Sequence, residues 1–394
     1  MKFEPVIRSL LDTDLYKLTM MQAVLHHYPA AEVEYTFKCR TEGVELAPLA
    51  IEIREQIKHL CELRFTENEI HYLNNIYYLK PDFVQFLKLF QLNSDYVHLG
   101  NNSDGEFDIS IRGPWLHTIM FEVPILAIVE EVFSRNENKK VDVKEGQRRL
   151  IEKTDFIKAH PLRDKFKLME FGTRRRFSRE WQQHVLEHLN RAIGDNLVGT
   201  SNVYFARELG LKPLGTMAHE YLQAFQALGP RLVDSQKEAL DVWAREYRGD
   251  LGIALTDVVG ADAFINDFDR YFAKLFDGVR HDSGCPFEWA DKILAHYEKL
   301  GVDPKTKSLV FSDGLNIPLA FQLLEKYHEK TNLVFGIGTN LTNDLGTKAL
   351  SIVIKMTKCN GQPVAKISDS PGKTMCKDEA YLTYLRSVFK LQAE

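Results

Sequence analysis

The sequence has few cysteines, and they follow no metal-binding pattern. Five cysteines occur among 394 residues, scattered from Cys39 to Cys376. An odd, scattered set is typical of free thiols in a reducing compartment and excludes a dense disulfide framework. We therefore expect a cytoplasmic protein without structural disulfides.

The sequence also lacks a long hydrophobic run and a large net charge. No stretch approaches the roughly 20 apolar residues of a membrane-spanning helix. The first residues include Glu4, Arg8, Asp12 and Asp14 and do not resemble a signal peptide. A net charge of −5 gives no general attraction to nucleic acid. We expect neither a membrane nor a nucleic acid as partner, so any anion must bind in a local basic pocket.

Two catalytic signatures are missing as well. The sequence contains no G-x-x-x-x-G-K-[ST] loop, which argues against a P-loop kinase, and no G-x-S-x-G nucleophile elbow. The hydrophobic content of 44% and the charged content of 27% are ordinary for a globular protein. The chemistry of the chain must therefore be found in other motifs.

The pattern of hydrophobic residues changes along the chain. Residues 1–135 mix helices, such as 12–28, with alternating strands at 32–40 and 106–112. From about residue 165, short strands alternate with helices, which predicts parallel strands joined by helical crossovers. The strands expected there are 168–171, 196–200, 214–216, 278–281, 308–312, 333–337 and 352–356.

We predict an α/β protein with two domains, because 394 residues are many for one compact core. Residues 136–356 would form an irregular (β/α) barrel of parallel strands that carries the active site, and a doubly wound open sheet is the alternative. Residues 1–135, joined by about 357–394, would form a smaller α+β domain.

Polar motifs recur where the predicted strands end. They are 172–176, 199–202, 215–219, 280–284, 312–314 and 336–340. Each motif alone has an ordinary explanation as a charge run or as turn glycines. Because ligands bind beyond the carboxyl ends of parallel strands, the six motifs together predict one functional site.

His219 is the most informative residue of these motifs. A helix predicted at 217–228 follows directly on the strand that ends near Gly215, and it stops at Gly229-Pro230. The partial positive charge of a helix start keeps an imidazole neutral and attracts phosphate. His219 is therefore a candidate nucleophile for a phosphoryl group, and simple packing near a turn is the alternative.

The other motifs predict a phosphate-rich substrate. Arginine grips phosphate through two parallel hydrogen bonds, and glycine lets backbone N–H groups approach phosphate oxygens. Asp282 and Asp313 are candidates for holding hydrated Mg²⁺ or ribose hydroxyls, because magnesium needs only one or two protein carboxylates. The sequence assigns no definite metal ligands.

At these motifs the sequence resembles the nicotinate phosphoribosyltransferase family, the type II phosphoribosyltransferases of NAD salvage. The segments 171–175, 215–219, 280–284 and 335–339 carry the resemblance, which extends from 12–17 to 368–373. It implies an irregular α/β barrel with a smaller α+β domain, in a homodimer with shared active sites. The implied reaction is an ATP-hydrolysing, ligase-type transfer from phosphoribosyl pyrophosphate to nicotinate, with Mg²⁺ as cofactor and ATP as co-substrate.

The resemblance also implies residue roles. The catalytic residues would be His219, phosphorylated by ATP, together with Arg280 and Asp282. Phe171 would cover one face of the pyridine ring, and Tyr16 of a neighbouring subunit the other. The implied substrate-binding residues are Tyr16, Phe171, Arg174, Arg175, Thr200, Thr216, Asp313, Gly336, Gly338 and Thr339. Arg280 and Thr216 would contact nicotinate. The phosphates would be held by Arg174 or Arg175 together with Gly336, Gly338 and Thr339.

Two further points concern substrate and metal. The resemblance implies nicotinate in preference to nicotinamide. Relatives that favour nicotinamide tend to offer its amide a carboxylate from the strand matching 198–202, but 199–202 contains no acid here, whereas Arg280 attracts a carboxylate. Cys285 stands where many relatives have an acidic residue, and we expect it to be a passive thiol.

Two other functions remain open from the sequence. One is a barrel metallohydrolase with zinc on His219, His281, Asp282 and Asp313, although no compact ligand pattern such as H-E-x-x-H occurs. The other is a non-catalytic sensor that binds phosphoribosyl groups.

Overall fold

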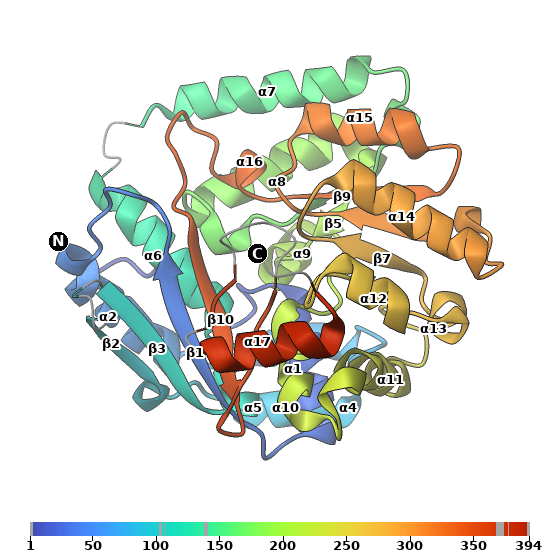
Figure 1. Cartoon of the computed structure of the whole chain (residues 1–394). Helices are drawn as coiled ribbons and strands as arrows, with labels where there is room; N and C mark the ends of the chain where they lie inside the picture. Colours follow the sequence, from blue (N-terminus) through green and yellow to red (C-terminus); the bar gives the residue numbers. More distant parts are fainter. Residues whose placement is uncertain are drawn as a thin grey trace.

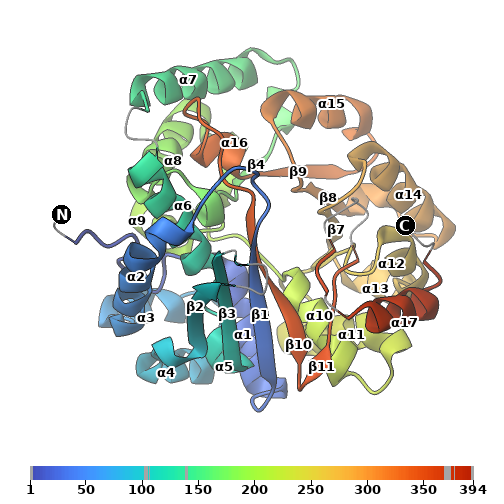
Figure 2. The same cartoon turned by 60° about the vertical axis from the view of Figure 1, so that its left-hand side comes forward.

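The computed structural model describes residues 3–101, 105, 107–137, 141–367, 374–376 and 378–391. These residues form a six-stranded sheet and a five-stranded sheet with helices packed around both (Figures 1 and 2). The predicted α/β class is confirmed. The motif predicted at 368–373 lies outside the described residues.

The six-stranded sheet is entirely parallel and has the order β5-β4-β9-β8-β7-β6. Its strands are β4 (Leu168–Glu170), β5 (Leu197–Thr200), β6 (Ile253–Leu255), β7 (Gly278–His281), β8 (Ser308–Phe311) and β9 (Asn332–Ile337). Among the helices of this part, α7 (Val143–Ala159), α8 (Arg179–Ile193), α14 (Pro286–Lys299) and α15 (Ile317–Tyr327) lie outside the strands in Figure 2.

The stretch 212–216 fills the space between the edge strands β5 and β6. On one side, Thr200 donates its N–H to Lys212 O (3.1 Å) and accepts the N–H of Leu214 (2.9 Å). On the other side, the Thr216 hydroxyl donates to Ile253 O (3.0 Å). The prediction of a strand at 214–216 is therefore wrong. The described residues here form a single bridge between Thr200 and Pro213, and proline has no N–H to continue a ladder. The position of this stretch nevertheless gives the sheet the irregular barrel form.

The five-stranded sheet is antiparallel and has the order β11-β10-β1-β3-β2. Its strands are β1 (Glu32–Cys39), β2 (Val97–Asn101), β3 (Phe107–Pro114), β10 (Ile352–Cys359) and β11 (Gln362–Pro363). The strand predicted at 352–356 thus pairs with β1 and does not belong to the parallel sheet. Ile352, Ile354 and Met356 are buried in alternation, which suits a sheet with one covered face.

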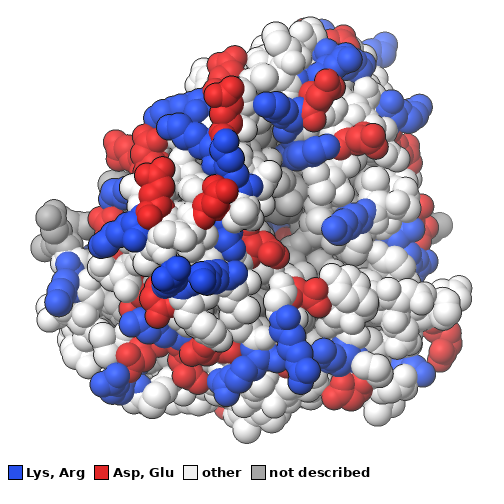
Figure 3. Space-filling model, turned by 90° about the vertical axis from the view of Figure 1, so that its right-hand side faces the viewer, with Lys and Arg blue, Asp and Glu red and all other residues white. Residues whose placement is uncertain are grey.

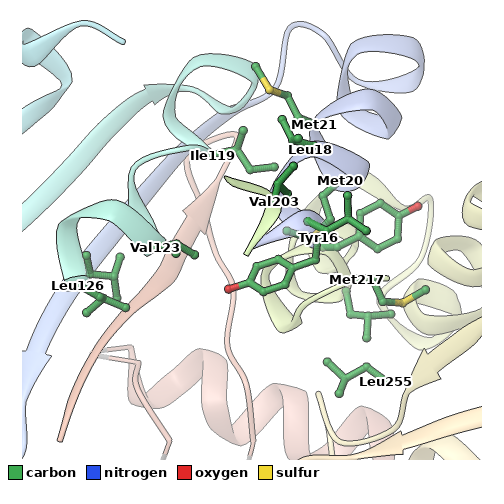
Figure 4. Packing of buried hydrophobic residues seen from close by; sticks show 14 of the residues in the cluster. Tyr16, Leu18, Met20, Met21, Ile119, Val123, Leu126, Val203, Met217 and Leu255 are labelled. Atoms are coloured by element: carbon green, nitrogen blue, oxygen red, sulfur yellow. The ribbon is translucent and has the colours of Figure 1, made fainter. Parts of the chain in front are cut away.

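Helix α1 (Leu15–His27) joins the two parts. Every residue from Leu15 to Val24 is buried, as expected for a helix packed on all sides. The helix contacts both α5 and α11. In the view of Figure 4, the Tyr16 ring lies between Val123 of α6 and Met217, which precedes α10. The start of α1 is therefore fixed at the junction of the parts.

The remaining helices complete the two parts. In the first are α2 (Ala50–Glu62), α3 (Glu67–Asn74), α4 (Pro81–Leu89), α5 (Trp115–Thr118) and α6 (Glu122–Glu137). The others are α9 (Val203–Leu209), α10 (His219–Leu228), α11 (Ser235–Tyr247), α12 (Ala261–Asp267), α13 (Arg270–Leu275), α16 (Thr339–Thr342) and α17 (Glu379–Phe389). Over the described ranges, every helix is too short or too polar to cross a membrane. Positive and negative side chains are interspersed on the face shown in Figure 3.

Candidate active site

A cleft opens where the parallel strands end. It contains about 960 Å³ of empty space, part of which is open to solvent. The predicted site residues that line it are Tyr16, Phe171, Arg174, Arg175, His219, Arg280, Asp282, Gly338 and Thr339. The strand-end motifs thus meet in one place, as the sequence predicts.

The other predicted residues lie beside the lining. The Thr200 hydroxyl is buried and donates to Glu170 Oε2 (2.6 Å), and the Thr216 hydroxyl is bonded to the backbone of β6. Gly336 leaves room for the Phe171 ring, because an added Cβ would lie 2.4 Å from Phe171 Cδ2. Asp313 stands between two lining residues of the loop after β8. These four residues therefore lie next to the lining of the cleft but are not part of it.

Tyr16 reaches the cleft from its own chain. Asp14 forms an antiparallel bridge with Asn202, and the Leu15 N–H donates to Ser201 O (2.8 Å). These bonds attach the start of α1 to the end of β5, so that Tyr16 and Phe171 line the same cleft. Within one chain Tyr16 thus lies beside Phe171, and the contribution of Tyr16 from a neighbouring subunit stays a prediction.

His219 is the first residue of α10, and Ala218 is its N-cap. Its Nε2 lies 2.9 Å from Asp257 Oδ1, and its Nδ1 lies 3.7 Å from Asp282 Oδ2. Burial lowers the pKa of His219 and the charge of Lys366 lowers it further, although Asp257 acts in the opposite direction. A neutral ring that donates Nε2–H to Asp257 keeps its lone pair on Nδ1.

Asp257 and Lys366 belong to the site but to none of the six predicted motifs. Asp257 also accepts from Ser283 Oγ (2.5 Å) and Lys366 Nζ (2.7 Å). Burial alone would raise the pKa of Asp257, but His219 and Lys366 hold it well below its ordinary value. Asp257 follows β6, a strand that the sequence pattern does not predict. The Ile367 N–H donates to Val258 O (2.8 Å), and this bond brings Lys366 beside Asp257. A prediction of β6 would have made Asp257 a seventh strand-end candidate.

Asp282 is the carboxylate of this group that remains partly open to the cleft. Its Oδ1 accepts from Ser312 Oγ (2.8 Å), and its side chain is 28% exposed. Burial would raise its pKa, but the charge of Arg280, and that of His219 whenever its ring is protonated, outweigh that effect and lower it. Asp282 is therefore ionised at neutral pH and can accept further ligands.

A buried ion network supports the arginine side of the cleft. Lys17 Nζ lies 2.5 Å from both Glu122 Oε2 and Glu220 Oε2, and its side chain is fully buried. Glu122 Oε1 lies 3.6 Å from Arg174 Nη1, and Glu220 directly follows His219. The network therefore connects the start of α1, the start of α10 and the arginine turn after β4.

The zinc alternative requires four side chains to converge: His219, His281, Asp282 and Asp313. The His281 ring is buried and packs against Trp289 and Phe311, with ring centroids 5.3 and 5.9 Å apart. It does not line the cleft. Among the described residues, the group with close ligand atoms is His219, Asp257 and Asp282, and Lys366 already holds one oxygen of Asp257. The geometry does not support a zinc hydrolase.

Comparisons with known proteins agree along the whole chain. The family model described as nicotinate phosphoribosyltransferase (NAPRTase) family matches residues 166–393, and that of its N-terminal domain matches residues 11–130. A nicotinate phosphoribosyltransferase of Xanthomonas euvesicatoria is 60% identical over 388 residues, which are 98% of each chain. A Burkholderia mallei protein of the same name is 59% identical over 386 residues, covering 98% of this chain and 97% of its own.

Solved structures give the same result. The nicotinate phosphoribosyltransferase of Vibrio cholerae superimposes with a TM-score of 0.94 at 45% identity, covering 99% of this chain and 95% of its own. A putative nicotinate phosphoribosyltransferase of Saccharomyces cerevisiae has a TM-score of 0.91 at 31% identity, with both chains fully covered.

Proposed function

We propose that this chain, which belongs to the nicotinate phosphoribosyltransferase family, couples its reaction to ATP through a phosphohistidine at His219. The reaction is the conversion of nicotinate to nicotinate mononucleotide. The observation that carries the proposal is the hydrogen bond from His219 Nε2 to Asp257. It leaves Nδ1 as the nucleophilic nitrogen at a helix start, where an anion is stabilised.

The first step we propose is phosphoryl transfer. The Nδ1 lone pair attacks the γ-phosphorus of ATP, the bond to the β,γ-bridging oxygen breaks, and ADP leaves. Water later hydrolyses the P–N bond and releases inorganic phosphate. Coupling this hydrolysis to synthesis would draw the reaction toward product.

The second step we propose is transfer of the phosphoribosyl group to nicotinate. Phe171 and Tyr16 would flank the pyridine ring, and Arg280 would bind its carboxylate. Arg174 and Arg175, with backbone N–H groups around Gly338 and Thr339, would bind the phosphates. The pyridine nitrogen already has a free lone pair, so its attack on the ribosyl carbon needs no general base.

The residues present fit a magnesium ion bound with the substrate. Asp282 offers an ionised, partly exposed carboxylate, and one or two carboxylates together with substrate phosphates suffice for Mg²⁺. Asp257 is less suitable, because Lys366, Ser283 and His219 occupy its oxygens. When bound, Mg²⁺ would neutralise charge on the departing pyrophosphate. The chain's own arginines would stabilise the same charge.

Product formation from nicotinate and phosphoribosyl pyrophosphate, with and without ATP, tests the proposal directly. We expect ATP to raise the yield and His219→Asn to abolish labelling by γ-phosphate while leaving weak, ATP-independent synthesis. Normal labelling of His219→Asn would disprove the phosphohistidine.

The substrate preference has its own test. Arg280 lines the cleft, and the segment 199–202 at the end of β5 contains no acid that could bind an amide. We expect a higher kcat/KM with nicotinate than with nicotinamide, and the reverse order would overturn the assignment.

A further inference from the structure

Glu170 is a buried carboxyl group that the proposed reaction does not use. It is the last residue of β4 and directly precedes Phe171, and it has no solvent exposure. Its position is behind the lining of the cleft, at the base of the turn that carries Phe171 and Gly172.

The hydrogen-bond partners of this carboxyl, over the described part of the chain, are neutral groups from three elements. Oε1 accepts from the Gly172 N–H (2.5 Å), Oε2 accepts from Thr200 Oγ1 (2.6 Å), and both oxygens lie 3.2 Å from Gln182 Nε2. Glu170 thus joins the turn after β4 to the end of β5 and to α8. It is a single carboxyl that holds the Phe171 turn against its neighbours.

The charged groups that face Glu170 do not neutralise it. Asp14, which lines the cleft at the start of α1, adds a second negative charge. From α8, Gln182 contacts Arg176, but that guanidinium makes two hydrogen bonds to Asp12 (2.7 and 2.8 Å). Burial, with the charge of Asp14, raises the pKa of Glu170 to about 7.

We propose that Glu170 is a positioning residue that takes up a proton when anionic substrate or product occupies the cleft. The inference rests on the proposed placement of the pyridine carboxylate and the phosphate in this cleft. A negative charge brought within roughly 10 Å of a buried carboxylate changes its protonation equilibrium by about tenfold. The proton comes from the solvent buffer and is returned when the ligand leaves.

The hydrogen bonds of the turn survive this change. One carboxyl oxygen takes the proton, and the other still accepts from the Gly172 N–H and the Gln182 amide. Thr200 Oγ1 already accepts from the Asn202 N–H (3.1 Å) and has a second lone pair for the new O–H. Glu170 therefore loses its charge and keeps Phe171 in place.

Calorimetric titration with nicotinate mononucleotide, without pyrophosphate, tests the inference. Titrations at pH 7.5 in two buffers of different ionisation enthalpy give the number of protons taken up per bound ligand. We expect wild type to take up roughly half a proton more than Glu170→Gln, because a tenfold change near pH 7 has that effect at this pH. Any uptake by the ligand's own phosphate is the same in both proteins and cancels.

The matched control is Glu246→Gln. Glu246 is a buried glutamate outside the cleft lining, where it accepts from Gln22 Nε2 (2.7 Å) and lies beside His26 Nδ1 (2.9 Å) and His27 Nε2 (3.1 Å). We expect this variant to take up as many protons as wild type. Equal uptake by wild type and Glu170→Gln would overturn the inference.

A second variant keeps the test decisive if Glu170→Gln folds poorly. Thr200→Val removes a hydroxyl whose hydrogen bond lowers the pKa of Glu170. The pH at which uptake is greatest should therefore rise, and an unchanged optimum would also overturn the inference. If wild type bound no nicotinate mononucleotide at any pH, the proposed function would fail as well. If it bound the nucleotide without any proton uptake that depends on Glu170, only this inference would be refuted.

Discussion

At the scale of single residues, Asp257 decides which nitrogen of His219 faces the cleft. Its carboxylate can only accept, so the ring must present N–H at Nε2 and a lone pair at Nδ1. Lys366 balances the charge of this carboxylate from a segment 109 residues further along the chain. The pair therefore fixes both the orientation and the protonation of the proposed nucleophile.

We expect Asp257→Asn to slow phosphorylation of His219 by about 100-fold or more, because an amide can also donate and so permits the wrong tautomer. Rapid-quench measurement of γ-phosphate incorporation gives this rate. The matched control is Asp262→Asn, since Asp262 is exposed on α12 and pairs with the exposed Lys292. A wild-type rate for Asp257→Asn would contradict the role of Asp257.

Gly336→Ala should disturb the pyridine site specifically. The added Cβ would lie 2.4 Å from the Phe171 ring, so the ring must move. A displacement of about 1 Å in a positioning group can cost 100-fold in rate, and we expect kcat/KM for nicotinate to fall between about 10- and 100-fold. Steady-state kinetics measure it, and Gly100→Ala, which meets no atom within 4 Å, should behave as wild type.

The sequence predicts the side chains that line the cleft better than those that support them. Phe171, Arg280 and Asp282 stand at strand ends, where polar residues in parallel sheets bind ligands. Lys17 and Lys366 are far in sequence from their acidic partners, and an isolated lysine carries no pattern that predicts burial. Their roles come from tertiary contacts alone.

At the scale of elements, α6 is attached to the loop between α16 and β10 through one buried carboxyl. Glu130 accepts from Asn343 Nδ2 (2.8 Å) and the Leu350 N–H (3.0 Å), and Asn343 also donates to Arg175 O (2.9 Å). Burial raises the pKa of Glu130 to about 8 from an ordinary value of 4.5. The folded protein therefore holds a proton here that the unfolded chain has already released.

The sign of the pH effect follows from this difference. Between pH 4.5 and about 8 the folded state binds more protons than the unfolded state at Glu130, so this residue lowers stability as the pH rises. We expect Glu130→Gln to gain about 4 kcal/mol relative to wild type between pH 5 and pH 9. Thermal midpoints of both proteins across this range measure it, and a constant difference between them would show that Glu130 does not titrate as proposed.

Element prediction succeeded where the pattern was long or regular. The predicted helix at 217–228 and the predicted strand at 278–281 agree with α10 and β7. The three-residue β6 is too short to show periodicity in the sequence, and a short apolar run such as 214–216 does not distinguish a strand from an extended loop. Strand β10 was placed in the wrong sheet, since its pairing with β1 depends on residues more than 300 positions away.

At the scale of the whole molecule, one chain brings together side chains from three distant segments at the proposed site. Tyr16, Phe171 and His219 line the same cleft, and the bonds that position Tyr16 join α1 to β5 of the same chain. The homodimer remains a prediction, but the cleft needs no residue from a partner to bring these side chains together.

Mixing two inactive variants separates these possibilities. We expect Tyr16→Ala and His219→Asn, unfolded together and refolded as a mixture, to show no more activity than the sum of the separate samples. Shared sites would regenerate one intact site per mixed dimer and restore about a quarter of the wild-type activity for random pairing. Assays of ATP-stimulated nicotinate mononucleotide formation distinguish the two results, and refolded wild type is the control.

The return of the chain from the barrel to β1 has a consequence during translation. Strand β1 is complete near residue 39, yet its partner β10 is synthesised only at residues 352–359, and Lys366 follows later still. Until then a flank of β1 has no neighbour, and such an open strand edge invites association with other nascent chains. The yield of active enzyme in cells is therefore expected to depend on how well this edge is protected while the chain is still on the ribosome.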